Sequence, residues 1–313
     1  MAAGALPTKV RMTAAAPRAG ASGRAYLLLT LTALCWGANA VFGRLAVGEI
    51  SPMALVALRW LGALGLLMVF ARAQVRRDWP TIRECLLFVA AMGAVGFTVF
   101  NALFYVAAHW TTAVNIGIIQ GSIPVFVLLG AFAAYRSRVG GLQVVGVLVT
   151  MLGVAIVASG GQLARLASLA LNSGDVLMIA ACVLYAGYTL GLSRRPPVSA
   201  LALFTVMAAA AAIASLPLAL AEAALGRFQW PTPAGWIIVG LVTLFPSFLA
   251  QISFIQGVSL IGPSRAGVFV NLVPVFASIL ALLVLGEPFE LFHGIALCLV
   301  LGGIWLSERG RAG

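Results

Sequence analysis

The chain has 313 residues, of which 62% are hydrophobic and only 9% are charged, and its formal net charge is +11 at pH 7. An ordinary soluble domain carries about 25% charged residues, so this composition excludes an ordinary globular enzyme, a nucleic-acid-binding module and a disordered chain. A spanning helix needs about 20 apolar residues. The composition therefore predicts an all-α protein made of membrane spans, short loops and tails.

Ten apolar runs are long enough to cross a membrane as helices. Residues 1–24 before them form an Ala- and Gly-rich segment that we expect to be a disordered cytoplasmic tail, and 308–313 form a second tail. The breaks hold Gly, Pro and charged residues, as in RAQVRRDWPTIRE, which we interpret as a loop. The expected spans are 26–47, 52–71, 85–107, 112–134, 141–159, 175–193, 199–221, 234–256, 264–285 and 291–307.

Basic residues fall almost entirely on one side of this arrangement. They lie in both tails and in the even-numbered loops, while Arg165 and Arg227 lie on the other side. Positive residues accumulate in cytoplasmic loops, so both termini are predicted to be cytoplasmic, and the net charge gives no reason to expect nucleic acid. The four cysteines have neither metal nor disulfide spacing and are interpreted as small buried hydrophobic residues.

The two halves of the sequence resemble each other at an offset of about 150 residues. The motif IPVF at 123–126 matches VPVF at 273–276, and Asn101 matches Gln251. Each half holds five spans, and because five is odd the second repeat must be inserted upside down. Inverted repeats are typical of transporters that alternate access around a central site. The expected units are a first repeat at 25–159, an extracytoplasmic linker at 160–174 and a second repeat at 175–307.

Several short motifs recur in a fixed order along the chain. They are Trp36-Gly37, Pro52 with Arg59, Pro124, Pro274 and Gly286-Glu287-Pro288. In their order, spacing and duplication, residues 26–307 resemble the ten-helix EamA-type members of the drug/metabolite transporter superfamily. The resemblance implies a secondary transporter of the bacterial inner membrane that exports small organic metabolites, above all amino acids, with the aromatic amino-acid exporters as the favoured branch. A sugar-phosphate or nucleotide-sugar carrier, or a membrane enzyme or scaffold that transports nothing, stays an alternative.

Pro124 and Pro274 lie deep in the fourth and ninth spans, at equivalent positions of the two repeats. A proline frees the carbonyl four residues earlier, here that of Gln120 or Val270, and such a break should face protein or a water-filled cavity. The two prolines are therefore candidate hinges at a central site, with plain structural kinks as the alternative. We expect spans 1, 3, 4, 6, 8 and 9 to line the cavity and spans 5 and 10 to brace it.

Polar and aromatic side chains gather on the same spans. Arg59 could hold a substrate carboxylate through a bidentate pair, or it could bond carbonyl oxygens at the outer end of the first span. Amides could contact substrate or join helices, and rings could stack on substrate or fill space. The candidate substrate-binding residues are Trp36, Asn39, Arg59, Asn101, Tyr105, Asn115, Gln120, Tyr185, Tyr188, Gln251, Phe254 and Asn271.

Acidic residues are placed only in loops or at span ends, so we expect no carboxylate proton relay. His109 and His293 lie at outer ends and are interpreted as solvated. The chain has no P-loop and no hydrolase or metalloprotease motif, so we expect no enzyme activity, no cofactor and no bound metal. The expected partners are the lipid bilayer and a small-molecule substrate, and the expected assembly is a monomer or a weak homodimer.

Overall fold

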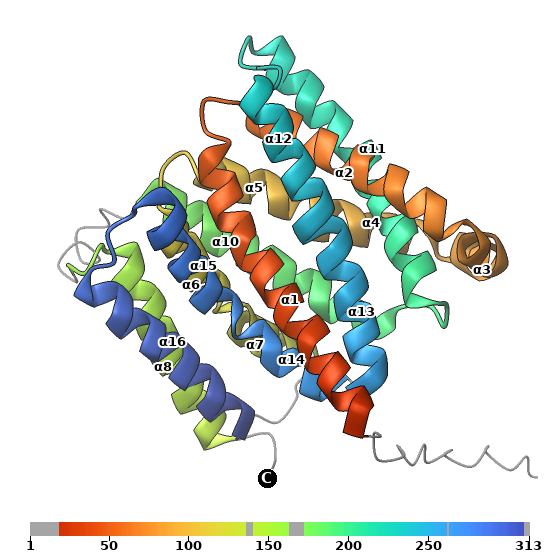
Figure 1. Ribbon diagram of the computed structural model, residues 1–313. Helices are drawn as coiled ribbons and strands as arrows, with labels where there is room; N and C mark the ends of the chain where they lie inside the picture. Colours follow the sequence, from red (N-terminus) through yellow and green to blue (C-terminus); the bar gives the residue numbers. More distant parts are fainter. Residues whose placement is uncertain (1–18, 136–139, 163–171, 262, 310–313) are drawn as a thin grey trace, which may run out of the picture.

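The computed structural model describes residues 19–135, 140–162, 172–261 and 263–309, and these residues form helices without any strand (Figure 1). The predicted tails and linker lie largely outside the described residues. The first half consists of α1 (Ala19–Leu45), α2 (Pro52–Phe70), α3 (Arg72–Glu84), α4 (Leu86–Gly93), η1 (Ala94–Val99), α5 (Phe100–Ala107), α6 (Ala113–Gln120), α7 (Ile123–Tyr135) and α8 (Gly141–Ala158). The second half consists of α10 (Ser173–Gly191), η2 (Leu192–Arg194), α11 (Ala200–Ala224), α12 (Pro233–Val242), η3 (Thr243–Leu249), α13 (Ala250–Ile261), α14 (Pro263–Val270), α15 (Val273–Leu280), η4 (Ala281–Leu285) and α16 (Leu291–Arg309).

The predicted multi-pass membrane fold is confirmed. Within the described residues, 8 helical stretches are long and apolar enough to cross a membrane, and several of them join consecutive helices of the same span. Two shorter apolar helices, Val273–Leu285 and Leu291–Ser307, occupy the predicted ninth and tenth spans. Ten complete spans and the cytoplasmic position of both termini stay predictions.

Equivalent helices of the two halves run in opposite directions. Arg44 at the end of α1 binds the turn after α5, and Asp175 at the start of α10 binds Thr111 in that same turn. Likewise α2 begins where α11 ends, because the Met53 N–H donates to the Glu222 carboxylate. An inverted repeat requires this arrangement, since each helix of one half must end on the side where its counterpart begins.

Interruptions occur at equivalent places in both halves. The helix of the fourth span breaks at Gly121-Ser122 and that of the ninth at Asn271-Leu272, so that Pro124 and Pro274 each lie in the first turn of the next helix. The predicted breaks are thereby confirmed. The third and eighth spans also contain equivalent π-helical turns, η1 and η3, which no feature of the sequence pattern predicted.

One predicted loop is wrong, because RAQVRRDWPTIRE forms helix α3, which lies at one edge of the molecule (Figure 1). Pro80 lies inside this helix and frees the carbonyl of Arg76, but both residues are exposed, so water can bond that carbonyl. Ile82 on the opposite face is fully buried. The helix thus packs Ile82 and Val75 against the core and keeps Pro80 on its exposed face.

Helices α8 and α16 lie side by side at another edge, as predicted for bracing spans (Figure 1). A Cβ added at Gly146 would lie 2.5 Å from the Gly303 carbonyl oxygen, so only glycine permits this approach. The interpretation of all cysteines as buried is wrong in part. Cys35 and Cys182 are buried, whereas Cys85 is half-buried and Cys298 is exposed on α16, where an apolar thiol suits lipid.

Candidate functional site

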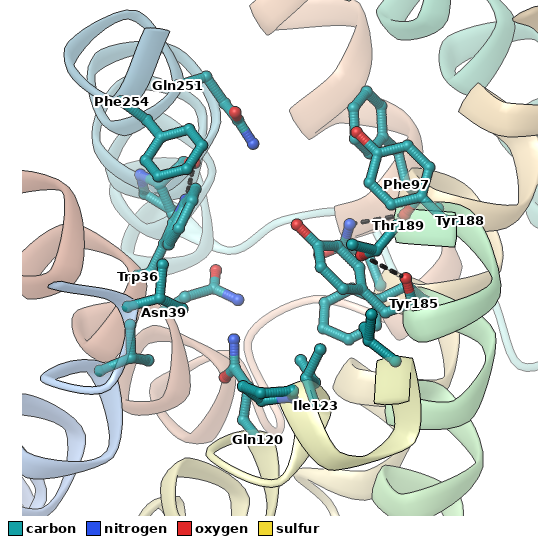
Figure 2. A pocket seen from close by; sticks show the side chains of 18 of the residues that line it. Trp36, Asn39, Phe97, Gln120, Ile123, Tyr185, Tyr188, Thr189, Gln251 and Phe254 are labelled. Atoms are coloured by element: carbon teal, nitrogen blue, oxygen red, sulfur yellow. Dashed lines mark hydrogen bonds between the residues drawn. The ribbon is translucent and has the colours of Figure 1, made fainter. Parts of the chain in front are cut away.

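A cavity of about 440 Å³ lies between the two repeats (Figure 2). Its lining comes from α1, η1, α5, α6, α7, α10, η3, α13, α14 and α15, which confirms the six predicted spans, and α2 contributes as well. A pocket of a few hundred Å³ suits a small organic molecule. The breaks in the fourth and ninth spans and both π-helical turns border this cavity, so irregular backbone occurs where it is shielded from lipid.

Two aromatic walls face each other across the cavity, as Figure 2 shows. Trp36 and Phe254 form one wall, with ring centroids 5.3 Å apart, and the Trp36 indole N–H donates to the Pro246 carbonyl at 3.3 Å. Tyr185 and Tyr188, 5.1 Å apart, belong to the other wall. The Trp36 ring is thereby tied to a carbonyl of the π-helical turn η3.

Amide side chains lie between the two walls. Asn39 and Gln251 point into the cavity from the side of Trp36, and Gln120 closes one end (Figure 2). The Gln120 Oε1 atom is buried and has no hydrogen-bond partner among the described residues. An unsatisfied buried acceptor is costly unless a ligand or water uses it. The Gln120 Oε1 atom is therefore a candidate acceptor for a hydrogen-bond donor of a ligand.

Arg59 sits against the cavity at the centre of a buried polar cluster and is only 5% exposed. Its Nε donates to the Ser247 hydroxyl at 2.6 Å, and its Nη1 donates to the Asn101 amide oxygen at 2.7 Å. Nη1 also contacts the Asn39 amide oxygen at 3.1 Å and the Tyr105 hydroxyl at 2.5 Å. The hydrogen bonds of Arg59 among the described residues use Nε and Nη1 rather than Nη2.

These partners differ from the carbonyl oxygens at the end of the first span that the sequence suggested. The π-helical turn η3 explains the difference, because it directs the Ser247 side chain toward α2 while that hydroxyl donates to the Val242 carbonyl at 2.6 Å. The equivalent turn η1 directs Thr98 toward α11, where its hydroxyl donates to the Ala211 carbonyl at 2.8 Å. The turns η1 and η3 therefore each join one repeat to the second helix of the other repeat, and the junction made by η3 includes the charged Arg59.

The structure brings most of the predicted site residues together and separates three of them. Tyr105 lies behind Arg59 and is 1% exposed, Asn115 lies in another cluster, and Pro274 does not line the cavity. Phe97 and Trp60 line it without having been predicted, and their rings stack 4.7 Å apart beside Arg59. The predicted residues that line the cavity are Trp36, Asn39, Arg59, Asn101, Gln120, Pro124, Tyr185, Tyr188, Gln251, Phe254 and Asn271.

A second polar cluster lies where α6, α10 and α16 begin. Asp175 is 1% exposed and His293 is 5% exposed, although the sequence interpretation treated the acids as loop or end residues and His293 as solvated. Asn115 connects them through its two amide atoms. Both residues belong to the first turn of a helix, and these helix ends are covered by neighbouring turns rather than by water.

His109 in the nearby turn is exposed, as expected. Partial desolvation and then the positive charge of Arg44 hold the pKa of this histidine below its ordinary value, against a weaker opposing effect of Glu222. His109 is therefore neutral at pH 7. Arg44 itself donates to the Ala108 carbonyl at 2.5 Å and lies 3.6 Å from the Glu287 carboxylate, as an anchor at a helix end should.

Comparison with known proteins finds one family model and several relatives that are named transporters. A family model described as the EamA-like transporter family matches residues 23–159 and again 172–309. The uncharacterized transporter YetK of Bacillus subtilis (strain 168) is 28% identical over 285 residues, which cover 90% of this chain and 86% of the relative. The uncharacterized inner membrane transporter YedA of Escherichia coli (strain K12) is 24% identical over 281 residues, 89% of this chain and 88% of the relative.

A solved protein crystal structure has the same fold, with a TM-score of 0.61 over 94% of this chain and 99% of that chain at 18% sequence identity. The double match of one family model confirms the predicted internal duplication. Both halves match the same family model, and the structure arranges them in opposite orientations.

Proposed function

The chain belongs to the EamA-like transporter family, and from this premise we propose that it is a secondary transporter that exports small organic metabolites, above all amino acids, by alternating access. Its relatives are named transporters, which favours transport over catalysis. The relative in Escherichia coli is named an inner membrane transporter, which supports the bacterial inner membrane as the location.

The observation that carries the amino-acid proposal is that Arg59 lines a cavity with two aromatic walls. Within the described residues, Arg59 is the one charged side chain that lines the cavity. Its Nη2 group is available for a carboxylate, and charge-assisted hydrogen bonds of this kind are about twice as strong as neutral ones. A zwitterion could place its carboxylate there while amide oxygens and ring faces receive its ammonium group.

The aromatic walls support the aromatic branch of this proposal. Trp36 with Phe254 and Tyr185 with Tyr188 present ring faces and edges on opposite sides of the cavity (Figure 2). Offset or edge-to-face contacts between rings contribute about 0.5–1.5 kcal/mol beyond the burial of area. A flat apolar side chain would use both walls, so aromatic amino acids should bind more tightly than small aliphatic ones.

The sugar-phosphate alternative finds less support. A phosphate group carries a charge near −2 and is usually held by several cations or a cluster of arginines. The described lining supplies Arg59 alone. A membrane enzyme or a scaffold, the second alternative, is distinguished by flux, since neither would exchange solutes across a sealed bilayer.

The test is counterflow in proteoliposomes, each batch loaded with one unlabelled amino acid or sugar phosphate and offered the same solute in labelled form. We expect saturable exchange of amino acids, fastest or tightest for aromatic ones, and none in empty liposomes. Saturable exchange of sugar phosphates without amino acids would replace the preferred substrate by the alternative. Absence of exchange for every solute class would contradict the transporter proposal itself.

An Arg59→Ala variant tests the role of the guanidinium. With an aromatic amino acid and the corresponding amine that lacks the carboxylate, we expect the variant to lose at least tenfold in affinity for the amino acid and little for the amine. Arg44→Ala is the matched control, because Arg44 lies outside the cavity lining. Equal losses for both ligands would show that Arg59 acts on structure alone.

A further inference from the structure

The buried cluster at the start of α6, α10 and α16 is not used by the proposed substrate site, yet it holds two titratable groups. We call it the outer cluster, and it consists of Thr111, Asn115, Asp175 and His293. It lies at the end of the molecule where α1 ends, which the charge pattern predicts to be extracytoplasmic. Asn115, Asp175 and His293 lie on α6, α10 and α16, and Thr111 lies in the turn before α6.

Hydrogen bonds join the cluster into a chain. The Thr111 hydroxyl donates to Asp175 Oδ1 at 2.5 Å, and Asn115 Nδ2 lies 3.2 Å from Asp175 Oδ2. The Asn115 amide oxygen lies 3.2 Å from His293 Nε2. The side chain of Asn115 therefore links the carboxylate on α10 to the imidazole on α16.

The contacts of His293 fix its protonation state. The backbone N–H of Glu290 donates to His293 Nδ1 at 3.0 Å, so Nδ1 must carry a lone pair and no proton. The proton of the neutral ring then lies on Nε2, which donates to the Asn115 oxygen. In this arrangement every member of the chain has a complementary partner, with donors facing acceptors throughout.

A second proton on His293 would break this arrangement at one point. Nδ1 would become a donor and would face the Glu290 N–H, which is also a donor. The imidazolium would instead be attracted to the carboxylates around it. Two carboxylates, those of Glu287 and Glu290, face it from the preceding turn, and Asp175 on α10 faces it through Asn115. Arg44 on α1 lies beside Glu287, and His109 lies beside Arg44.

The cluster lies at an end that must separate if the cavity is to open there. Glu287 accepts the backbone N–H groups of Ala113 and Val114 at the start of α6, at 3.0 and 3.1 Å. On the other side of the same end, the Thr232 N–H donates to the Glu49 carbonyl at 2.9 Å. These contacts hold that end together, and the outer cluster adds a buried histidine to them.

We propose that the outer cluster is a proton-binding latch: with His293 neutral it holds the ends of α6, α10 and α16 together, and a proton from the outer medium releases it. The inference rests on the proposed transport function for its consequence, which is that release of cargo to that side depends on external pH. The proton is thus a ligand that controls opening, and the proposal needs no carboxylate proton relay through the membrane.

Hydrogen–deuterium exchange of the full chain in lipid nanodiscs tests the latch without any substrate. After correction for intrinsic rates, lowering the pH from 8 to 5.5 should raise exchange of residues 112–116 and 290–294 at least tenfold. His293→Gln keeps a donor but cannot titrate, so this response should vanish. His109→Gln is the matched control, since the chain has 2 histidines and His109 makes no contact in the cluster.

Asp175→Asn provides a second variant, which removes the negative charge and keeps one acceptor oxygen for the Thr111 hydroxyl. The carboxylate stabilises a charged imidazole, so its loss should move the midpoint of the pH response to lower pH. A wild-type protein without a pH response, or a response that persists in His293→Gln, would overturn the proposal.

Flux measurements then connect the latch to transport. In counterflow, acidification on the side of the cluster should accelerate exchange in the wild type and in His109→Gln but not in His293→Gln. Flux that ignores pH in all three proteins would overturn the link to cargo release. If no solute is exchanged at any pH, the transporter proposal fails while hydrogen exchange still decides whether the latch exists.

Discussion

At the scale of single residues, Tyr105 and Tyr185 differ in where they lie relative to the cavity. The Tyr105 hydroxyl bonds Arg59 and lies 3.0 Å from the Asn39 amide oxygen, without reaching the cavity. Tyr185 lines the cavity. The first tyrosine therefore belongs to the support of the site and the second to its surface, although both lie on predicted central spans.

A matched pair of variants should separate these roles. Tyr105→Phe removes a hydrogen bond to a charged group, which costs about 2 kcal/mol, so we expect a lower Tm in detergent and an unchanged KM. Tyr185→Phe removes a hydroxyl from the cavity surface and should raise KM with little change in Tm. Thermal unfolding and counterflow on both proteins provide the measurements, and a Tyr105→Phe protein with wild-type Tm would contradict the assignment.

The sequence predicts a residue of the site best where polarity at membrane depth and equivalence in the repeat both indicate it. Asn101 and Gln251 are both polar at membrane depth and equivalent in the repeat, and both line the cavity. Asn115 is polar at membrane depth, but the repeat pairs it with no second amide. It lies near the outer end of its span, so its partners depend on how α10 and α16 are placed. Sequence spacing does not contain that placement.

At the scale of helices, glycine determines how closely α8 and α16 approach. A Cβ at Gly146 would meet the Gly303 carbonyl and the Ser307 backbone nitrogen, at 2.5 and 2.6 Å, and neither can move without the helix. A Cβ at Gly187 in α10 would meet nothing within 4 Å. The two glycines thus have the same sequence context of an apolar span and opposite structural roles.

Alanine at these positions should have opposite effects. Gly146→Ala should destabilise the protein by about 1–3 kcal/mol, as overpacking of a close contact does, and should lower its Tm. Gly187→Ala should be neutral or raise the Tm, since alanine favours a helix by about 1 kcal/mol over glycine. Thermal unfolding of both purified variants is the measurement, and equal behaviour would contradict the close approach of α8 to α16.

The helix breaks beside Pro124 and Pro274 lead to a prediction about motion. Replacing either proline by alanine restores a backbone donor and allows a continuous helix, so the two rigid halves would lose a bending point. We expect Pro124→Ala and Pro274→Ala to lower the rate of counterflow at least tenfold, with an unchanged or higher Tm.

Pro217→Ala provides the control for this prediction, since Pro217 lies inside α11, is exposed and does not line the cavity. A variant at Pro124 or Pro274 that transports at the wild-type rate would show that its proline is a structural kink only.

Helix periodicity and apolar length predict the spans well because lipid imposes them. They do not predict η1 and η3, since a π-helical turn accommodates one extra residue without changing composition. They also fail for α3, where charge and Pro80 suggest a loop although Ile82 finds a buried site. The local sequence pattern therefore predicts whether a segment lies in lipid better than it predicts the backbone conformation of that segment.

At the scale of the whole molecule, the two ends of the bundle are closed by different chemistry. The end with the outer cluster is held in part by two buried side chains that can carry charge, Asp175 and His293. At the opposite end, Asp78 of α3 accepts the Ser199 N–H at 2.8 Å at the start of α11, and so joins the first repeat to the second. A carrier that alternates access must open each end in turn, so the pH response of each end matters.

Asp78 should not respond to pH in the physiological range. Its bonds to Arg77 and then to Ser199 hold the pKa of its carboxyl well below the ordinary value. A carboxyl with a depressed pKa in the folded state stabilises the fold at every pH above its unfolded value, and this stability disappears only as the pH falls toward the folded value. The junction of α3 with α11 is therefore constant between pH 5 and pH 8, because this interval begins about one unit above the pKa of an unfolded aspartate.

Asp78→Asn should accordingly lower the Tm by the same amount at pH 6 and at pH 8. His293→Gln should behave differently, because it removes the imidazole that the latch proposal makes the proton acceptor, and its Tm relative to the wild type should rise as the pH falls. Thermal unfolding of the three proteins in one detergent at both pH values compares the two ends directly. If the Asp78→Asn penalty varied with pH as the His293→Gln effect does, the two ends would not titrate independently, and a pH response of transport could no longer be assigned to the outer cluster.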